Sequence, residues 1–121
     1  MSLPLTEQER HNLAMNIVGK DLEAQGFEFL AVNSTLKKNP QFVVLKDKTI
    51  HFIVVKAITF PNPIQDYDKN SMLKMKMHAD KFEAKTFYAG VGLGHGSNYQ
   101  LPILKDEYYT VVYHGLQEIV F

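Results

Sequence analysis

A short apolar segment that contains one lysine is the strongest constraint on how this chain folds. The segment from His51 to Ala57 (HFIVVKA) is rich in β-branched and aromatic residues, which are typical of a strand. Both faces of this strand are apolar apart from Lys56, so we expect a central strand that is covered on both sides. A charge there needs a partner, because an unpaired buried charge is costly. Glu28, Asp47 or a bound anion would serve; alternatively, Lys56 reaches water from the margin of the sheet.

The apolar periodicity around this segment predicts two helices and five strands. We expect helices over residues 6–25 and 67–83, strands over 27–32, 41–45, 49–60, 85–91 and 108–114, and a tail element of undecided type over 116–121. Thr6 and Glu9 form the pattern of a capping box at the start of the first helix. The glycine-rich stretch over 92–98 is interpreted as a flexible loop with His95 exposed at its tip, because no helical pattern follows it.

The order of these elements predicts a mixed α/β fold in a single domain over residues 1–121. Three successive strands with short connections favour an antiparallel meander, and the helix before the fourth strand permits a right-handed crossover to a parallel neighbour. We therefore expect a mixed central sheet flanked by a helix on each face, an α/β (α+β mixed) architecture. The run from Tyr108 to Tyr113 is predicted to be an edge strand, where pairing of two copies would give a homodimer.

The same order of elements, with two short motifs, resembles the core of the PD-(D/E)XK, or restriction-endonuclease-like, superfamily. The motifs are Pro40-Gln41 and, after the turn to the next strand, Val54-Val55-Lys56. The resemblance covers roughly residues 6–92 and implies an αβββαβ core. In that superfamily an acid follows the proline and another lies two residues before the lysine. Its archaeal Holliday-junction-resolvase-like members carry a further acid on the first helix. Here these positions hold Gln41, Val54 and Met15, and only Lys56 is kept.

The three replacements remove the groups on which the chemistry of that superfamily depends. In active members the acids bind Mg²⁺, which needs hard oxygen ligands, and the lysine orients or activates water. Met15 and Val54 carry no oxygen ligand, and Gln41 offers only a neutral carbonyl. The resemblance therefore implies a catalytically inactive nuclease-like scaffold that is used for binding or assembly, with no metal site and no cofactor.

Two other interpretations remain open. The protein is a Mg²⁺-dependent DNA endonuclease or resolvase-like enzyme if its acidic ligands have moved, for example to Glu9, Glu23, Glu28 or Asp47. Two carboxylates close to Lys56 would distinguish that case. If the resemblance is accidental, the chain is a small dimeric mixed-sheet protein unrelated to nucleases.

The charge balance leaves the partner undetermined. Thirteen basic and thirteen acidic residues cancel, so no global positive field indicates nucleic acid, although a local basic face is compatible with this balance. The lysines that would contact a phosphate backbone are Lys37, Lys38, Lys56, Lys69 and Lys76. A solvated helix face is the commoner explanation for those on the second helix. Nucleic acid and protein both remain candidate partners. The chain has no cysteine and no apolar run that would span a bilayer, so we expect a cytoplasmic protein without membrane contact.

Overall fold

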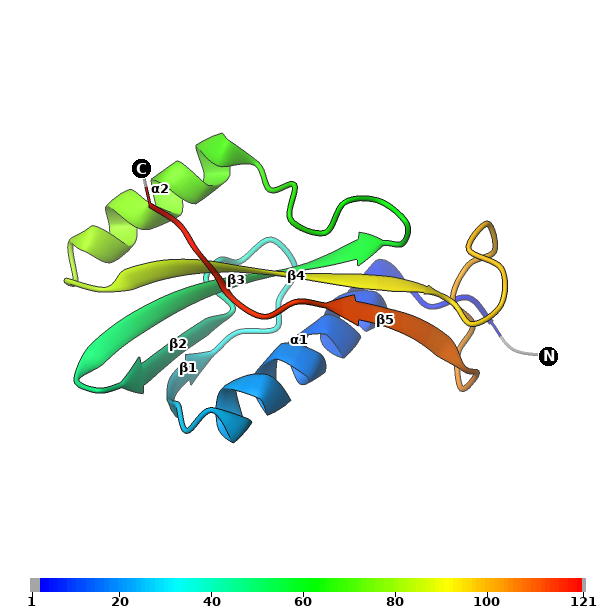
Figure 1. Ribbon diagram of the computed structural model, residues 1–121, viewed down its shortest axis with the longest axis horizontal. Helices are drawn as coiled ribbons and strands as arrows, with labels where there is room; N and C mark the ends of the chain where they lie inside the picture. Colours follow the sequence, from blue (N-terminus) through cyan, green and yellow to red (C-terminus); the bar gives the residue numbers. More distant parts are fainter. Residues whose placement is uncertain (1–2, 121) are drawn as a thin grey trace.

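The computed structural model describes residues 3–120, which form one mixed sheet of six strands with two helices (Figure 1). The elements in chain order are α1 (Glu7–Ala24), β1 (Glu28–Val32), β2 (Phe42–Lys46), β3 (Thr49–Thr59), α2 (Lys69–Asp80), β4 (Lys85–His95), β5 (Tyr109–Tyr113) and β6 (Gln117–Glu118). The strands lie in the order β1-β2-β3-β4-β5, and β6 pairs with β4. The first three strands pair antiparallel, and β3 pairs parallel with β4. The predicted mixed α/β fold, with its meander and parallel crossover, is confirmed.

The first helix begins and ends where its sequence signals predict. The backbone N–H of Glu9 donates to Thr6 Oγ1 at 3.1 Å, and the N–H of Thr6 donates to Glu9 Oε1 at 2.9 Å. The bond from the Thr6 backbone N–H lowers the pKa of the Glu9 carboxyl group, and the Thr6 side chain lowers it further. At the other end, Gly26 follows the helix with a φ of 84°, a left-handed conformation that glycine adopts without steric cost. The capping box and the glycine stop are confirmed.

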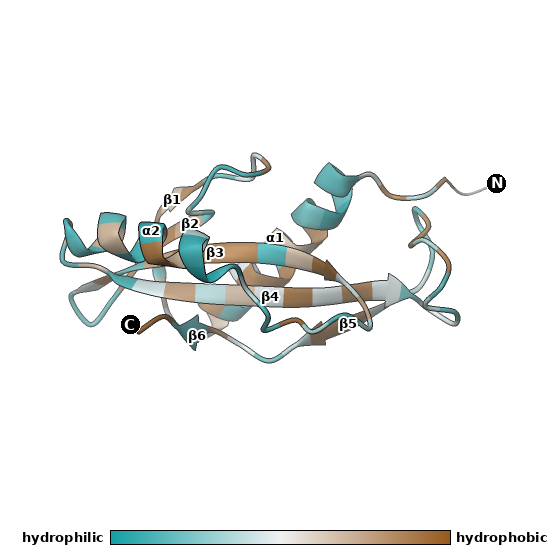
Figure 2. Ribbon diagram, turned by 90° about the horizontal axis from the view of Figure 1, so that it is seen from above, coloured by the Kyte–Doolittle hydropathy of each residue, from teal (hydrophilic) through white to brown (hydrophobic). Residues whose placement is uncertain are grey.

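The central strand β3 is covered by a different helix on each face, as predicted. Ile53 and Val55 belong to the larger core cluster, which contains the buried face of α1. Val54 points the other way and packs with Met72 of α2 and with Tyr88 of β4. Figure 1 shows the two helices on opposite sides of the sheet, and Figure 2 shows apolar residues along β3 and β4. The sheet therefore has a core on each side, and β3 contributes to both.

The second helix is shorter than the predicted range of 67–83. It starts after Asp68, whose side chain accepts hydrogen bonds from the backbone N–H groups of the first turn. Ala79, in the last turn, is fully buried. Phe82, which the predicted range places in the helix, lies beyond its last turn and is 55% exposed. The predicted range is too long at this end, because the helix ends at Asp80.

The glycine-rich stretch is not a loop over 92–98 as predicted, because β4 continues to His95. Gly90, Gly92 and Gly94 share one face of the strand, since side chains alternate. A Cβ atom on Gly90 would overlap the backbone carbonyl oxygen of Ile64, and one on Gly92 would lie 2.8 Å from Ile64 Cγ2. The glycines therefore allow the connection between β3 and α2 to lie directly on β4, and the phenol of Tyr88 donates to Ile64 O at 2.9 Å.

The sheet has an edge strand at each end, β1 and β5. The edge position predicted for the run that contains β5 is confirmed, and the pairing of two copies there stays a prediction. The hydroxyl of Tyr113 in β5 donates to Asp21 Oδ2 of α1 at 3.0 Å, and burial together with the Asp21 charge raises the pKa of Tyr113. The undecided tail element is β6. Within residues 3–120, neither helix has the length and apolar character needed to cross a bilayer.

Candidate functional site

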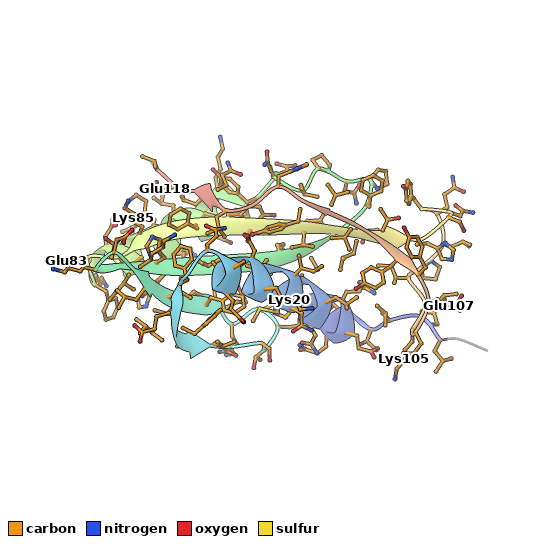
Figure 3. All side chains as sticks on the ribbon, turned by 60° about the horizontal axis from the view of Figure 1, so that its bottom comes forward. Lys20, Glu83, Lys85, Lys105, Glu107 and Glu118 are labelled. Carbon is orange, nitrogen blue, oxygen red and sulfur yellow. The ribbon has the colours of Figure 1, made fainter. Side chains whose placement is uncertain are left out.

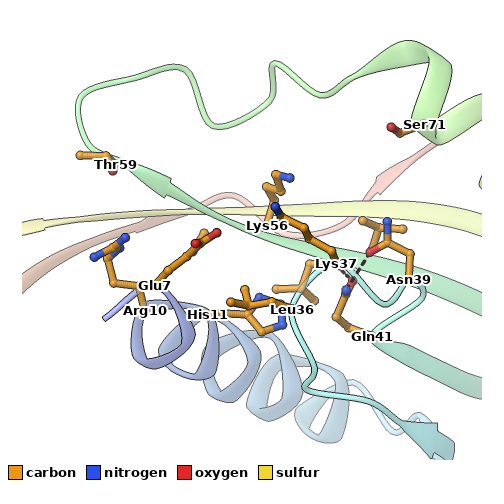
Figure 4. Close-up of a pocket in the computed structure, with 13 residues that line it drawn as sticks. Glu7, Arg10, His11, Leu36, Lys37, Asn39, Gln41, Lys56, Thr59 and Ser71 are labelled. Atoms are coloured by element: carbon orange, nitrogen blue, oxygen red, sulfur yellow. Dashed lines mark hydrogen bonds between the residues drawn. The ribbon is translucent and has the colours of Figure 1, made fainter. Parts of the chain in front are cut away.

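Strand β3 is paired with β4 along most of its length but with β2 along its first half only, and a cleft lies where β2 ends. On one side, β4 accompanies β3 from His51 to Thr59. On the other side, β2 accompanies β3 only as far as Ile53. Between Val54 and Thr59, β3 therefore has an open edge, along which lies a cleft of about 460 Å³ (Figure 4). Its walls come from the first turns of α1, the connection before β2, the open half of β3 and the start of α2.

Gln41 closes the ladder at the point where β2 ends. Its side chain is 1% exposed, and its Oε1 accepts a hydrogen bond of 2.7 Å from the backbone N–H of Val55. Its Nε2 donates to Asn39 Oδ1 at 2.7 Å, which Figure 4 marks with a dashed line, and to Lys38 O at 3.4 Å. A buried backbone N–H without a partner is costly, so the Gln41 side chain supplies the bond that a strand neighbour would otherwise make.

The four positions that the motifs single out do not meet in one place. Gln41, Val54 and Lys56 all line the cleft. Met15, in contrast, is buried on α1 and lines a separate groove between α1 and β1. The α1 residues that face the cleft include His11, one turn before Met15, and Glu7, two turns before it.

The carboxylates proposed as relocated ligands lie away from the cleft. Glu23 lines the groove between α1 and β1, and Glu9 lines a hollow beside the connection that precedes β5. Glu28 lies on β1, and Asp47 lies in the turn between β2 and β3. The cleft has one carboxylate in its lining among residues 3–120, that of Glu7.

The donor set of the cleft does not fit Mg²⁺. This ion takes hard oxygen ligands in octahedral geometry and is normally held through carboxylates. The cleft offers the Glu7 carboxylate and the Gln41 amide, whose oxygen is already bound to the Val55 N–H. No group of three or more histidine, aspartate or glutamate side chains lies close enough to hold a metal ion in the part of the chain that the structure describes.

Cationic side chains from three separate segments gather at the cleft instead. They are Arg10 of α1, Lys37 of the connection before β2, and Lys56 of β3. Arg10 is positioned by a hydrogen bond of 2.9 Å from its Nη1 to Leu5 O. Lys56 is exposed, and no carboxylate of residues 3–120 lies within 4.0 Å of it. Neither Glu28 nor Asp47 is its partner, so Lys56 reaches water and the cleft.

His11 adds an unpaired polar atom to the same wall. The residue is 5% exposed, and its buried Nε2 has no hydrogen-bond partner among the described residues. Burial lowers the pKa of His11, and the nearby Lys56 charge lowers it further, although Glu7 acts in the opposite direction. The imidazole is therefore neutral at physiological pH. Buried polar groups normally have a partner, so the unpaired nitrogen indicates a position for water or a ligand.

The remaining lysines of the predicted set stay outside the cleft. The backbone carbonyl of Lys38 accepts a hydrogen bond from the Gln41 side chain, but Lys38 does not line the cleft. Lys69 is the first residue of α2, and Lys76 forms a salt bridge of 3.2 Å with Asp80 on the same helix. Two further charged side chains, those of Glu83 and Lys105, lie toward opposite ends of the molecule (Figure 3). Of the sequence-based set, Lys37 and Lys56 line the same cleft, and Arg10 and His11, which also line it, are not in that set. Their spacing from Glu7, three and four residues on, would have placed all three on one helix face.

Comparison with known proteins gives a family for nearly the whole chain. A family model described as "Domain of unknown function (DUF8840)" matches residues 8–119, which include α2, all six strands and all of α1 except Glu7. No curated protein matches the chain by sequence. Because the match covers well over half of its length, the chain belongs to the DUF8840 family.

Proposed function

We propose that this protein is a binding module on a restriction-endonuclease-like core, that it does not hydrolyse nucleic acid, and that its cleft binds the phosphate groups of a nucleic acid. The αβββαβ order, the parallel pairing of β3 with β4 and the place of Lys56 beside the end of β2 support the core assignment. The Mg²⁺-binding acids of active members have no counterpart in the lining of the cleft apart from Glu7. Binding without metal-dependent hydrolysis is the function that this set of side chains can perform.

The single observation that carries the proposal is the convergence of Arg10, Lys37 and Lys56 on one cleft. Arginine presents several N–H donors in a plane that matches phosphate oxygens, and lysine adds a compact charge. One carboxylate in the lining leaves the cleft with excess positive charge, although the whole chain has a net charge of +0. The charge of the chain is therefore distributed so that a phosphate group is attracted to this place.

The open edge of β3 adds an uncharged donor to this cleft. Backbone N–H groups along a strand point alternately to its two sides. The N–H of Val55 points to the β2 side, where it meets Gln41, so the N–H of Ala57 points to the same side. No strand lies there among the described residues, and Ala57 lines the cleft. Phosphate oxygens readily accept bonds from such backbone donors.

The proposal is tested by fluorescence anisotropy with labelled single-stranded and duplex oligonucleotides, in EDTA and at two salt concentrations. We expect binding that weakens with salt, with a log–log slope of about −2 for single strands and about −3 for the duplex, given three phosphate contacts. Lys56→Ala and Arg10→Ala should each weaken binding and reduce the slope by about one unit. Lys76→Ala is the matched control, because Lys76 is paired with Asp80 outside the cleft. Absence of binding at low salt, or an equal effect of Lys76→Ala, would overturn the proposal.

A second assay tests the alternative that the protein is a nuclease. Glu7 is the carboxylate in the lining of the cleft, so it is the acid that this alternative would use. Plasmid and branched DNA are incubated with the protein in Mg²⁺ or Mn²⁺, and we expect no cleavage. Cleavage that is lost in Glu7→Gln but kept in Glu9→Gln would show instead that an acid has moved to α1 and that the protein is a nuclease. Glu9 is the matched control, because it caps α1 and lines a different hollow.

A further inference from the structure

A second, less polar hollow adjoins the basic cleft. It has a volume of about 360 Å³ and lies at the ends of β3 and β4, beneath the connection that follows β4. Arg10 and Thr59 line both the cleft and this hollow. We call the hollow the Tyr99 pocket, after the aromatic residue in its lining. The two spaces therefore meet at Arg10, and a chain molecule that lies in the cleft can continue into the pocket.

The ring of Tyr99 is held in place on two sides and is open on another. It lies on Gly94, where a Cβ atom would come within 3.2 Å of Tyr99 Cδ1. The ring of Phe60 meets it edge-on, with centroids 4.4 Å apart and an interplanar angle of 71°. Tyr99 nevertheless remains 46% exposed, and Leu101 beside it is also exposed. An aromatic ring that is fixed by its neighbours and open to the pocket provides a stacking surface.

We infer that the Tyr99 pocket binds an unpaired nucleobase, so that the ligand class of this protein is single-stranded nucleic acid. This inference rests on the proposed function of the cleft. Proteins that bind single strands combine a basic groove for the backbone with aromatic rings on which bases stack. Here Arg10 stands at the junction, and only one of its N–H groups is used by Leu5 O, so others can reach a phosphate. In a duplex the base is paired and stacked within the helix and does not reach the pocket.

The experiment compares an oligothymidine, the same oligomer with abasic sites, and a duplex of equal length, by fluorescence anisotropy at low salt. We expect wild-type protein to bind oligothymidine roughly 5- to 100-fold more tightly than the abasic oligomer, the range that stacking of one base gives. Tyr99→Ala should remove this difference and leave the salt dependence unchanged, since the phosphate contacts remain. Tyr99→Phe keeps the ring and should keep the difference. It also keeps the test valid if the alanine variant does not fold.

Tyr108→Ala is the matched control, because Tyr108 is 81% exposed and does not line the pocket. Equal binding of the oligothymidine and the abasic oligomer by wild-type protein, with Lys56 still required, would overturn the inference and leave the proposed function standing. A base preference that survives in Tyr99→Ala would overturn it as well. If no oligonucleotide binds at all, the proposed function fails and this inference fails with it.

Discussion

The two halves of β3 have similar sequences but different surroundings. From His51 to Ile53 the strand lies between β2 and β4, and its backbone is paired on both sides. From Val54 to Thr59 it is paired with β4 alone. The first half is part of a closed sheet, whereas the second half forms one wall of the basic cleft.

The candidate site therefore arises because β2 ends, and not because of any change in β3 itself. Where β2 is absent, the backbone N–H of Val55 is satisfied by the Gln41 side chain, and the edge at Ala57 faces the cleft. The side chains of the open half still supply core residues, because Val55 packs toward α1. One strand thus supports the fold with its side chains and leaves its free edge open along the cleft.

The largest expected effect is on stability, from a substitution in the closed half. Ile53 is fully buried, so Ile53→Ala should lower the free energy of unfolding by about 2–5 kcal/mol through lost burial and the cavity left behind. Lys56→Ala, three residues later, should change it by no more than about 0.5 kcal/mol, because Lys56 is exposed and has no ion-pair partner in the described chain. Urea unfolding followed by circular dichroism measures both. Similar losses in the two variants would mean that the halves do not differ energetically.

An intermediate effect is expected at the boundary between the halves. Gln41→Ala leaves the Val55 N–H buried without an acceptor, which should cost about 1–3 kcal/mol of unfolding free energy. Asn39→Ala removes only one partner of the Gln41 amide nitrogen, which keeps its contact with Lys38 O, so its effect should be smaller. The same urea titration compares the two. A larger loss for Asn39→Ala would show that the amide does not act as the end of the ladder.

The smallest expected effect is a dependence of stability on pH, to which two histidines contribute: His51 within the closed half and His11 of α1 beside the open half. Burial lowers the pKa of His51 in the closed half and of His11 beside the open half. In the unfolded chain each histidine binds a proton near its ordinary pKa of about 6.5, so the unfolded state takes up more protons as the pH falls. The unfolding free energy should therefore decrease from about pH 7 to about pH 5.

Thermal unfolding at a series of pH values measures this dependence. His51→Gln and His11→Gln should each flatten the curve, because each removes one histidine that is kept neutral in the fold. Nucleic acid should reduce the acid sensitivity contributed by His11 and leave that of His51 unchanged, since only His11 lines the cleft. A wild-type curve that rises toward acid pH would contradict the direction of both pKa shifts.

Much of the fold follows from local patterns, whereas the site depends on how distant segments meet. The capping box at Thr6 and the apolar run through Ile53 are short-range signals, and the helix boundary and central strand that they predict are present. The sequence groups Lys37 and Lys56 only within a broader set of lysines that would contact phosphate, and it does not predict that these two line one cleft. The contribution of Arg10 depends on how α1 lies against β3, which no local pattern specifies.

The error at the glycine-rich stretch has a long-range physical cause. Glycines in succession usually indicate a loop, because they lack side chains that fill a sheet. At Gly90 and Gly92 this absence serves packing, since the connection that contains Ile64 lies against the strand. That contact joins residues far apart in the chain and leaves no mark near the glycines themselves. The start of α2, which lies later than predicted, has a local origin instead, because the Asp68 side chain caps the helix where it begins at Lys69.

The contact of Ile64 with β4 also constrains the length of the chain that follows it. The Tyr88 hydroxyl donates to Ile64 O, and Gly90 and Gly92 leave room for Ile64 against β4, so Ile64 is a fixed point between β3 and α2. Only four residues separate Ile64 from Lys69, where α2 begins and brings Ser71 to the cleft. An insertion after this point would displace the start of α2, and Ser71 with it, from the cleft.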